Sequence, residues 1–388
     1  MTIGFSPRAI IFCCALSTVG ALAFLAHFAV AGTGTGSAAP GPAASQQPLL
    51  YESDTQVRPR AGAPEVPNVS ALSWVVADAD SGKVLAAHDA HRPLPPASTL
   101  KTLFALTVLP TLPRDTQHTV TEQELAGIGP GSSLVGVREG HTYRVADLWR
   151  GVFLNSGNDA VHVLAALNGG VDTTVRKMQA KARALGALDT HVVTPDGYDA
   201  PGQVSSAYDL AVFGRAGLHD PDFARYCATA ESTFPGDGGS YEIANTNRLL
   251  TGADGVAAYP GLIGIKNGYT SGAGNTLVAA ARHGARTLVV TVMNPQEGGG
   301  FAVYEEARSL LDWGFSAAER VTPVGSLLPD RPPVAGSGPT TVPRTKPAQE
   351  DGDGAGWPDP GALAGAVGVG AGALVLALRL KGGRSTRG

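Results

Sequence analysis

The chain has 388 residues with 29 basic and 33 acidic side chains, so its formal net charge at pH 7 is −4. Because the basic residues form no stripe along the chain, the composition excludes a nucleic-acid partner held by charge. The length leaves room for one large domain or two lobes between terminal segments of a different character.

Residues 1–31 have the pattern of a secretory signal peptide. Arg8 precedes a charge-free run over residues 9–31, which closes with Ala-Val-Ala before Gly32. The run is long for a signal peptide, so an uncleaved N-terminal anchor is the alternative. Removal of this segment takes two of the three cysteines with it and leaves Cys227, so we expect no disulfide bond.

Two further segments have the composition of linkers. Residues 32–67 are rich in Gly, Ala, Pro, Ser and Gln and lack hydrophobic periodicity, which is typical of a flexible tether. Residues 321–360 are rich in proline and include an acidic patch, and we interpret them as a second linker. The folded domain is therefore expected over residues 68–320.

A second apolar run, residues 361–378, contains 18 residues without a charge and is just long enough to cross a bilayer. The basic tail, residues 379–388, follows at once, and such a tail stays in the cytoplasm. We therefore expect a single-pass protein of the cell membrane, held in the cytoplasmic membrane by this helix. Its folded domain would lie on the extracytoplasmic side.

The folded domain begins with strand patterns and continues with helix patterns. Residues 73–78 and 83–87 are strand-like and flank an Asp-Ser-Gly turn, which predicts a hairpin. The helix that follows Ser98 is apolar nearly all round, which indicates a buried helix, and Pro110 ends it. Four more helices are predicted, over residues 145–153, 159–167, 173–185 and 207–217.

From Gly261 the hydrophobic period changes to that of strands. Three strands are predicted, over residues 262–266, 276–282 and 287–293, and then an amphipathic helix over 303–315. Strands at both ends that enclose helices predict an α/β (α+β) fold. In it, an antiparallel sheet is flanked by helices and carries an inserted all-helical lobe.

Ser98 and Lys101 are the first candidates for chemistry. Three residues apart on a helix, they share a face about one turn apart. A lysine removed from water can lose its proton and act as a base toward the hydroxyl group. The pattern is common by chance, and its ordinary interpretation is a helix cap with a solvated lysine.

Two other segments strengthen the interpretation of Ser98 and Lys101 as a catalytic pair. Ser156-Gly-Asn158 forms a polar corner between two predicted helices, where its ordinary role would be capping. Lys266-Asn267-Gly268 comes at the end of a predicted strand, where it would ordinarily be a turn. Together the three segments resemble the Ser-x-x-Lys, Ser-x-Asn and Lys-Thr-Gly motifs of penicillin-binding proteins and serine β-lactamases.

The resemblance extends to a narrower family. Segments at 76–85, 205–211, 245–250 and 311–315 look like those of the D-alanyl-D-alanine carboxypeptidase family, and the likeness covers residues 68–320. It implies an α/β lobe and an all-α lobe with the active site in the crevice between them. It also implies a serine-type carboxypeptidase of peptidoglycan biosynthesis, which removes the terminal D-alanine from stem peptides and is inhibited by β-lactams.

The resemblance assigns roles to residues. The expected catalytic residues are Ser98 as nucleophile, Lys101 as base and Ser156 as proton relay to the leaving amine. The backbone N–H groups of Ser98 and Tyr269 would form the oxyanion hole. The expected substrate-binding residues are Asn158, Lys266, Gly268, Tyr269 and Thr270. No metal and no cofactor are implied.

Two positions depart from the family pattern. Asn267 stands where the family usually has threonine, and residues 294–301 lack the arginine that many members place near the substrate carboxylate. These changes leave open a non-catalytic wall-binding protein of the same fold. The family also leaves open a DD-endopeptidase that acts on cross-bridges.

Two other enzyme classes fit the sequence less well. A class A β-lactamase needs a Glu-x-x-Leu-Asn segment between the second and third motifs, and the chain has none there. A zinc peptidase would need a third ligand near His88 and His91, and none has convincing spacing.

Overall fold

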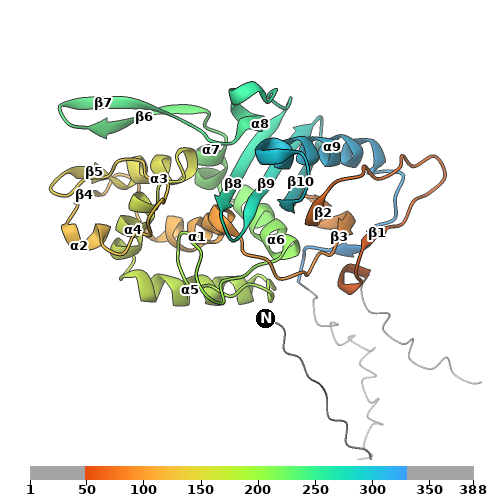
Figure 1. Ribbon diagram of the computed structural model, residues 1–388, viewed down its shortest axis with the longest axis horizontal. Coiled ribbons are helices and arrows are strands. Elements are labelled where there is room, and N and C mark those ends of the chain that lie inside the picture. The colour runs from red at the N-terminus through yellow and green to blue at the C-terminus, as the bar shows by residue number, and fades with distance from the viewer. Residues whose placement is uncertain (1–48, 330–388) are drawn as a thin grey trace, which may run out of the picture. The chain divides into compact units, whose positions relative to one another are not determined.

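The computed structural model describes residues 49–329, and Figure 1 shows their arrangement around one antiparallel sheet. Within these residues the strand order is β1-β3-β2-β10-β9-β8, and β11 also pairs with β3. The strands are β1 (Thr55–Val57), β2 (Ala71–Asp78), β3 (Lys83–His88), β8 (Leu262–Thr270), β9 (Gly274–His283), β10 (Arg286–Pro295) and β11 (Gly325–Ser326). Strand β8 therefore forms one edge of the sheet.

Both faces of the sheet are buried, which explains why its central strands are apolar at successive positions. Along β2, Trp74 and Val76 pack into one hydrophobic cluster, and Val75 packs into the other. The same alternation appears in β10, where Val289 and Val290 belong to opposite clusters. Successive side chains of a strand point to opposite faces, so one strand serves two cores.

Helices cover the two faces. Helix α9 (Ala302–Ala317) packs on β10, β9 and β2 at one face. Helix α6 (Ala207–Leu218) packs on β10 and β2 at the other, where α1 (Lys101–Val108) lies beside α6. Figure 1 shows α9 and α6 on either side of the strands. The sheet is thus the middle layer of a three-layer lobe.

The chain between α1 and β8 forms a second lobe that is mainly helical. Its helices are α2 (Glu122–Leu125), α3 (Val145–Leu154), α4 (Asn158–Leu167), α5 (Val171–Ala184) and α7 (Pro221–Cys227). Helix α6 returns to the sheet, and α8 (Arg248–Thr251) packs on β8 and α9. Two hairpins belong to it, β4 (Gln117–Thr119) with β5 (Thr142–Arg144), and β6 (Glu231–Gly236) with β7 (Gly239–Ala244). Short 3-10 turns are η1 (Leu49–Tyr51), η2 (Ala97–Leu100), η3 (Leu109–Thr111), η4 (Ala253–Gly255) and η5 (Gly299–Phe301).

The predicted fold class is confirmed, as are the opening hairpin, the buried helix and the final strands and helix. Strand β8 is four residues longer than the predicted 262–266, so the third motif lies within a strand. The two hairpins of the helical lobe were not predicted. Most of their side chains are exposed, and β4 and β5 have only three residues each, which is too short for a periodic sequence pattern. Cys227 is buried, and within the described residues it is a free thiol.

The linker boundaries at 67 and 321 are wrong for the residues next to the domain. Residues 49–67 contribute the buried Leu50 and strand β1, and residues 321–329 contribute β11 and three buried apolar side chains. Each segment pairs with β3 over two or three residues, which is too short for a periodic sequence pattern. The predicted signal peptide, membrane helix and basic tail, and the remaining parts of both linkers, lie outside the described residues. Within 49–329, none of the helices combines the length and hydropathy that a membrane span requires.

Candidate active site

Ser98 lies on a tight turn where the chain enters its buried helix. The turn is η2, and α1 continues directly from it, so Ser98 precedes the α-helix by one 3-10 turn. Ala97 has φ +49°, a left-handed conformation that is strained for a residue with a side chain. The Pro96 carbonyl before it accepts hydrogen bonds from Thr99 Oγ1 at 2.5 Å and Thr276 Oγ1 at 3.0 Å. These bonds hold the turn against strand β9.

Lys101 points directly at Ser98. Its Nζ lies 2.7 Å from Ser98 Oγ and 2.7 Å from the backbone carbonyl oxygen of Asp196. The lysine is 1% exposed, and burial lowers its pKa to about 8, although the negative charges of Asp196 and Asp159 oppose the shift. A lysine with this pKa is partly neutral near pH 7 and can accept the proton of the hydroxyl group.

Asp196 is a site residue that the motifs did not identify. Its carboxylate is buried, lies 3.5 Å from His162 Nε2 and accepts a hydrogen bond from the Tyr198 N–H at 2.9 Å. Burial raises the pKa of this carboxyl group, but the His162 hydrogen bond and the charge of Lys101 outweigh it and bring the value to about 2. Asp196 therefore stays charged and keeps its backbone carbonyl fixed beneath Lys101.

Ser156 and Asn158 lie at the corner between α3 and α4, as predicted. Ser156 has φ +57°, and its buried Oγ makes no hydrogen bond within residues 49–329. Asn158 donates from Nδ2 to Ser132 Oγ at 3.0 Å, whereas its buried Oδ1 has no partner among the same residues. Buried polar atoms are nearly always hydrogen-bonded, so Ser156 Oγ and Asn158 Oδ1 are available to bond a substrate or a transferred proton.

Asp159 shapes the opposite wall of the site. Its carboxylate accepts the Ala160 N–H and three N–H groups of one distant loop, from Val135 at 3.0 Å and from Gly136 and Val137 at 2.8 Å. These bonds fix the loop that carries Ser132 and Ser133. Nothing local in the sequence shows which loop this carboxylate meets.

Lys266 is buried on β8, and its Nζ donates to the Asn267 carbonyl at 2.7 Å. Burial lowers its pKa well below the usual value, and the nearby charge of Lys101 lowers it further. A carboxylate bound next to Lys266 would stabilise the protonated form of the lysine. The side chain is therefore suited to bind an anionic group that takes the place of the water lost on burial. Asn267 turns the other way, and its Oδ1 accepts from Thr246 Oγ1 at 3.0 Å.

Gly268 brings β8 against the turn that carries Ser98. A Cβ atom at this position would lie 2.7 Å from the Ser98 backbone nitrogen and 2.8 Å from Thr276 Oγ1. Only glycine permits this approach, which sets the neighbouring Tyr269 beside Ser98 at one cavity.

The predicted residues gather around one cavity of about 280 Å³, which we name the Ser98 cavity. Four of them line it, namely Ser98, Asn158, Tyr269 and Thr270, together with the loops at 130–133 and 197–199. Lys101, Ser156, Lys266 and Gly268 do not line it and are buried. Tyr269 is 67% exposed at the rim, and Thr270 Oγ1 donates to Asp199 Oδ1 at 2.7 Å.

The histidines weighed as zinc ligands have other partners. His88 Nδ1 lies 3.0 Å from Thr55 Oγ1, and His91 Nδ1 lies 2.7 Å from Asp189 Oδ2. In the described part of the chain, no three His, Cys, Asp or Glu side chains converge as metal ligands would. Arg308 donates to the Ala257 carbonyl and does not line the Ser98 cavity.

Comparison with known proteins agrees with this geometry. The sequence profile of a family described as D-alanyl-D-alanine carboxypeptidase matches residues 60–297. The chain is 43% identical over 277 residues to a Mycobacterium tuberculosis protein named D-alanyl-D-alanine carboxypeptidase DacB2, covering 71% of this chain and 91% of that protein. It is 37% identical over 264 residues to the Escherichia coli D-alanyl-D-alanine carboxypeptidase DacD, covering 65% of this chain and 64% of that one.

Solved structures give the same result. A crystal structure of a D-alanyl-D-alanine carboxypeptidase from Mycobacterium tuberculosis superposes with a TM-score of 0.64 at 41% identity. The match covers 70% of this chain and 100% of that one. A DD-transpeptidase from Streptomyces superposes with a TM-score of 0.59 at 26% identity, covering 64% of this chain and 99% of that one.

Proposed function

Since this chain belongs to the D-alanyl-D-alanine carboxypeptidase family, we propose that it is a serine peptidase that removes the terminal D-alanine from peptidoglycan stem peptides. The observation that carries the proposal is the 2.7 Å contact between the Nζ of the buried Lys101 and the Oγ of Ser98, which lines the Ser98 cavity. The reaction passes through an ester of Ser98, and β-lactams act as acylating mimics of the substrate.

In the first step, neutral Lys101 takes the Ser98 proton while Oγ attacks the carbonyl carbon of the bond between the two D-alanines. The backbone N–H groups of Ser98 and Tyr269 stabilise the resulting oxyanion, and one such donor is worth about 10²–10³ in rate. Collapse breaks the C–N bond. The proton on Lys101 then passes through Ser156 to the leaving amine of D-alanine.

Hydrolysis of the ester uses the same groups. Lys101 is neutral again after the amine has left, so it can take a proton from water while the oxygen attacks the ester carbonyl. The bond between Ser98 Oγ and the acyl carbon breaks, and Oγ recovers its proton from Lys101. The enzyme returns to its starting state with one water consumed.

Substrate binding follows from the free edge of β8. An extended peptide adds to such an edge through backbone hydrogen bonds, here along Lys266, Gly268, Tyr269 and Thr270. Asn158 supplies a side-chain amide from the opposite wall. Lys266 neutralises the terminal carboxylate.

A covalent label tests this assignment. Fluorescent penicillin should attach to the wild-type protein and not to Ser98→Ala, and Lys101→Ala should label at least about 100-fold more slowly because it lacks the general base. Mass spectrometry of a pentapeptide reaction should show release of one D-alanine. Absence of both labelling and turnover would identify a non-catalytic binder, whereas cleavage of cross-linked muropeptides alone would identify an endopeptidase.

We further propose that the enzyme works outside the cytoplasmic membrane. The signal-like residues 1–31, the apolar run 361–378 and the basic tail 379–388 support this location. The full chain should remain with membranes after a high-salt wash, and protease added to spheroplasts should degrade the catalytic domain. Release of the full chain by the salt wash, or a catalytic domain that the added protease does not degrade, would refute this location. Neither result would bear on the proposed reaction.

A further inference from the structure

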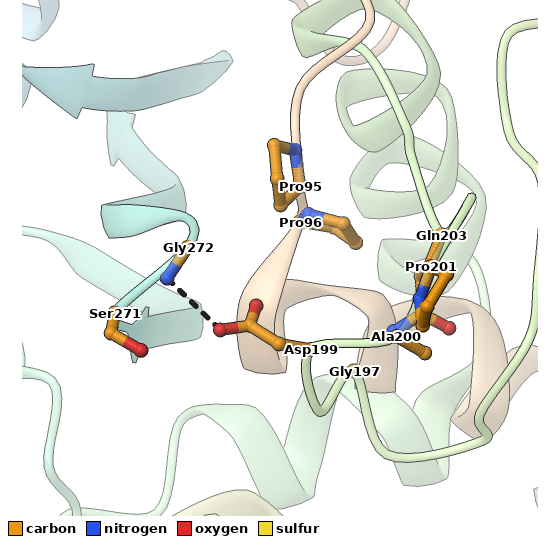
Figure 2. A pocket seen from close by; sticks show the side chains of 9 residues that line it. All are labelled: Pro95, Pro96, Gly197, Asp199, Ala200, Pro201, Gln203, Ser271 and Gly272. Atoms are coloured by element: carbon orange, nitrogen blue, oxygen red, sulfur yellow. Dashed lines mark hydrogen bonds between the residues drawn. The ribbon is translucent and has the colours of Figure 1, made fainter.

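Two loops form walls of the Ser98 cavity, and different contacts hold them. The loop at 197–199 separates this cavity from a second one of about 450 Å³. It is tied to the turn after β8, because Asp199 Oδ2 accepts from the Gly272 N–H at 2.9 Å, the bond drawn in Figure 2. The other wall, at 130–133, begins an irregular segment over residues 130–137 that we name the Ser132 loop. The contacts that hold the Ser132 loop therefore bear on the shape of the cavity.

The Ser132 loop sets the orientation of Asn158. The Ser133 carbonyl accepts from the Asn158 backbone N–H at 2.8 Å, and Ser132 Oγ accepts from Asn158 Nδ2 at 3.0 Å. The second bond fixes the plane of the side-chain amide, which lines the Ser98 cavity. A shift of this loop would turn the amide that is expected to meet the substrate.

Two side chains from outside the Ser132 loop hold its backbone at Val135. Asp159 accepts the Val135 N–H, and the Tyr241 hydroxyl on β7 donates to the Val135 carbonyl. Burial raises the pKa of Tyr241, so its hydroxyl group remains a donor at neutral pH. Both backbone polar groups of Val135 are therefore bonded, one to the start of α4 and one to the β6–β7 hairpin.

The loop and the hairpin are shaped to fit this contact. Gly136 has φ +96°, and a Cβ atom there would lie 2.6 Å from Tyr241 Oη, so glycine leaves room for the hydroxyl group. The Tyr241 ring packs against the buried Phe234 of β6, with ring centroids 5.8 Å apart. The aromatic contact holds the ring, and the ring presents its hydroxyl to the loop.

The β6–β7 hairpin is itself fixed to the helical lobe. Both of its strands pack on α3, and Figure 1 shows the hairpin along the lobe that carries α3, β4 and β5. At its tip, Asp237 pairs with Arg138 and His141, which follow the Ser132 loop in the chain. The hairpin is thus a rigid support from which Tyr241 can hold the loop.

We propose that Tyr241 is a positioning residue of this active site, which orients Asn158 for the substrate by holding the Ser132 loop at Val135. The inference rests on the proposed peptidase function and adds a determinant that lies outside the three motifs. Tyr241 does not line the Ser98 cavity, so it acts only through the loop.

Tyr241→Phe tests the proposal, because it removes the hydroxyl group and keeps the ring on Phe234. The second-order rate constant for labelling of Ser98 by fluorescent penicillin should fall about five- to tenfold, the rate equivalent of one neutral hydrogen bond. The matched control is Tyr208→Phe, which also removes a tyrosine bond to a backbone carbonyl, that of Ser326, away from the Ser98 cavity. It should label at the wild-type rate. Thermal melts check that both variants are folded at the labelling temperature.

A double-mutant cycle separates positioning from a general structural role. Ser132→Ala removes the bond between the loop and the Asn158 side chain, so the further change Tyr241→Phe should then cost less than about twofold. A merely structural hydroxyl group would cost the same with and without Ser132 Oγ.

Two results would overturn the positioning role. One is labelling of Tyr241→Phe at the wild-type rate, and the other is an equal loss in the wild-type and Ser132→Ala backgrounds. Failure of penicillin to label the wild-type protein is a different outcome. It would refute the peptidase function, and the positioning role with it.

Discussion

Lys101 and Lys266 show how their surroundings set the chemistry of two identical side chains. Both are buried, and burial disfavours the charged form of each. Lys101 also lies near two carboxylates, which limit the fall of its pKa to about 8. Lys266 faces the charge of Lys101, so its pKa falls further. The first is therefore suited to exchange a proton at neutral pH, and the second to receive an anionic substrate.

The pH dependence of acylation tests the role of Lys101. The base must be neutral, so the second-order rate constant with penicillin should rise with pH and level off above about 8. In Asp196→Asn the midpoint should move to lower pH, because the charge of Asp196 raises the pKa of Lys101. Stopped-flow labelling between pH 5 and 10 measures both, with Asp115→Asn as the control. A rate independent of pH from 6 to 9 would rule out Lys101 as the titrating base.

At the scale of elements, the site depends on how closely β8 approaches the turn that carries Ser98. Gly268 makes this contact, and the bond from Thr276 to Pro96 on the next strand holds the turn in place. The backbone of an edge strand thus becomes part of the cavity wall. A side chain at position 268 would push strand and nucleophile apart.

Gly268→Ala should therefore separate catalysis from folding. The added Cβ would lie 2.7 Å from the Ser98 nitrogen, so we expect acylation to fall by at least about 100-fold, the effect of a lost oxyanion donor. Gly239→Ala on β7 is the matched control, because a Cβ there meets no atom within 4 Å. Labelling rates and thermal melts of both variants give the comparison. Near wild-type labelling in Gly268→Ala would show that the strand can move away without cost.

For the whole molecule, two short segments cover the edge of β3. Strand β1 pairs Thr55–Val57 with β3, and β11 pairs Gly325 with Val84. Val321, Val324 and Leu327 bury their side chains around β11. An uncovered strand edge invites pairing with other chains, so these segments protect against aggregation as well as adding buried area.

Truncation measures that contribution. A fragment of residues 49–329 should unfold cooperatively, whereas residues 68–320 should be less stable and prone to aggregate. Removal of each fully buried apolar side chain should lower the free energy of unfolding by about 1.5–3 kcal/mol. Urea unfolding and light scattering compare the two fragments, with penicillin labelling as a check on the site. Equal stability of both fragments would show that the segments pack without stabilising the domain.

Asp209 links the stability of the molecule to pH. Burial raises its pKa to about 7, with the charge of Asp189 adding to the shift against the Thr190 hydrogen bond and the nearby His91. The folded state then holds a proton that the unfolded chain releases near pH 4. The contribution of Asp209 to the free energy of unfolding should therefore be greatest below about pH 4. It should fall as the pH rises from about 4 to about 7, by up to about 4 kcal/mol in total.

Asp209→Asn should remove most of that loss. Urea unfolding at pH 5 and pH 8 should give a smaller difference for the variant than for wild type, because the amide does not titrate. Asp115→Asn controls for the change in net charge, since its side chain is exposed. The same pH difference in Asp209→Asn and wild type would mean that another group causes it.

The sequence by itself identified the Ser98 and Lys101 pair, the three motifs, the fold class and most of the elements. Each of these depends on spacing within one helix or strand. Ser98 and Lys101 are one turn apart, and the strands 73–78 and 287–293 show their buried pattern locally. Local periodicity reflects local geometry, so the order of elements follows from the sequence, and the motifs carry the family resemblance.

Only the tertiary structure decided what surrounds those residues. Asp196 lies 95 positions from Lys101 and offers it a backbone carbonyl, a group that nearly every residue has and no motif can mark. Asp159 holds a loop more than 20 residues earlier, and Asp199 divides two cavities by contacts with Thr270 and Gly272. Such contacts arise from packing between distant segments. They depend on the path of the backbone in three dimensions, which cannot be inferred from local sequence patterns.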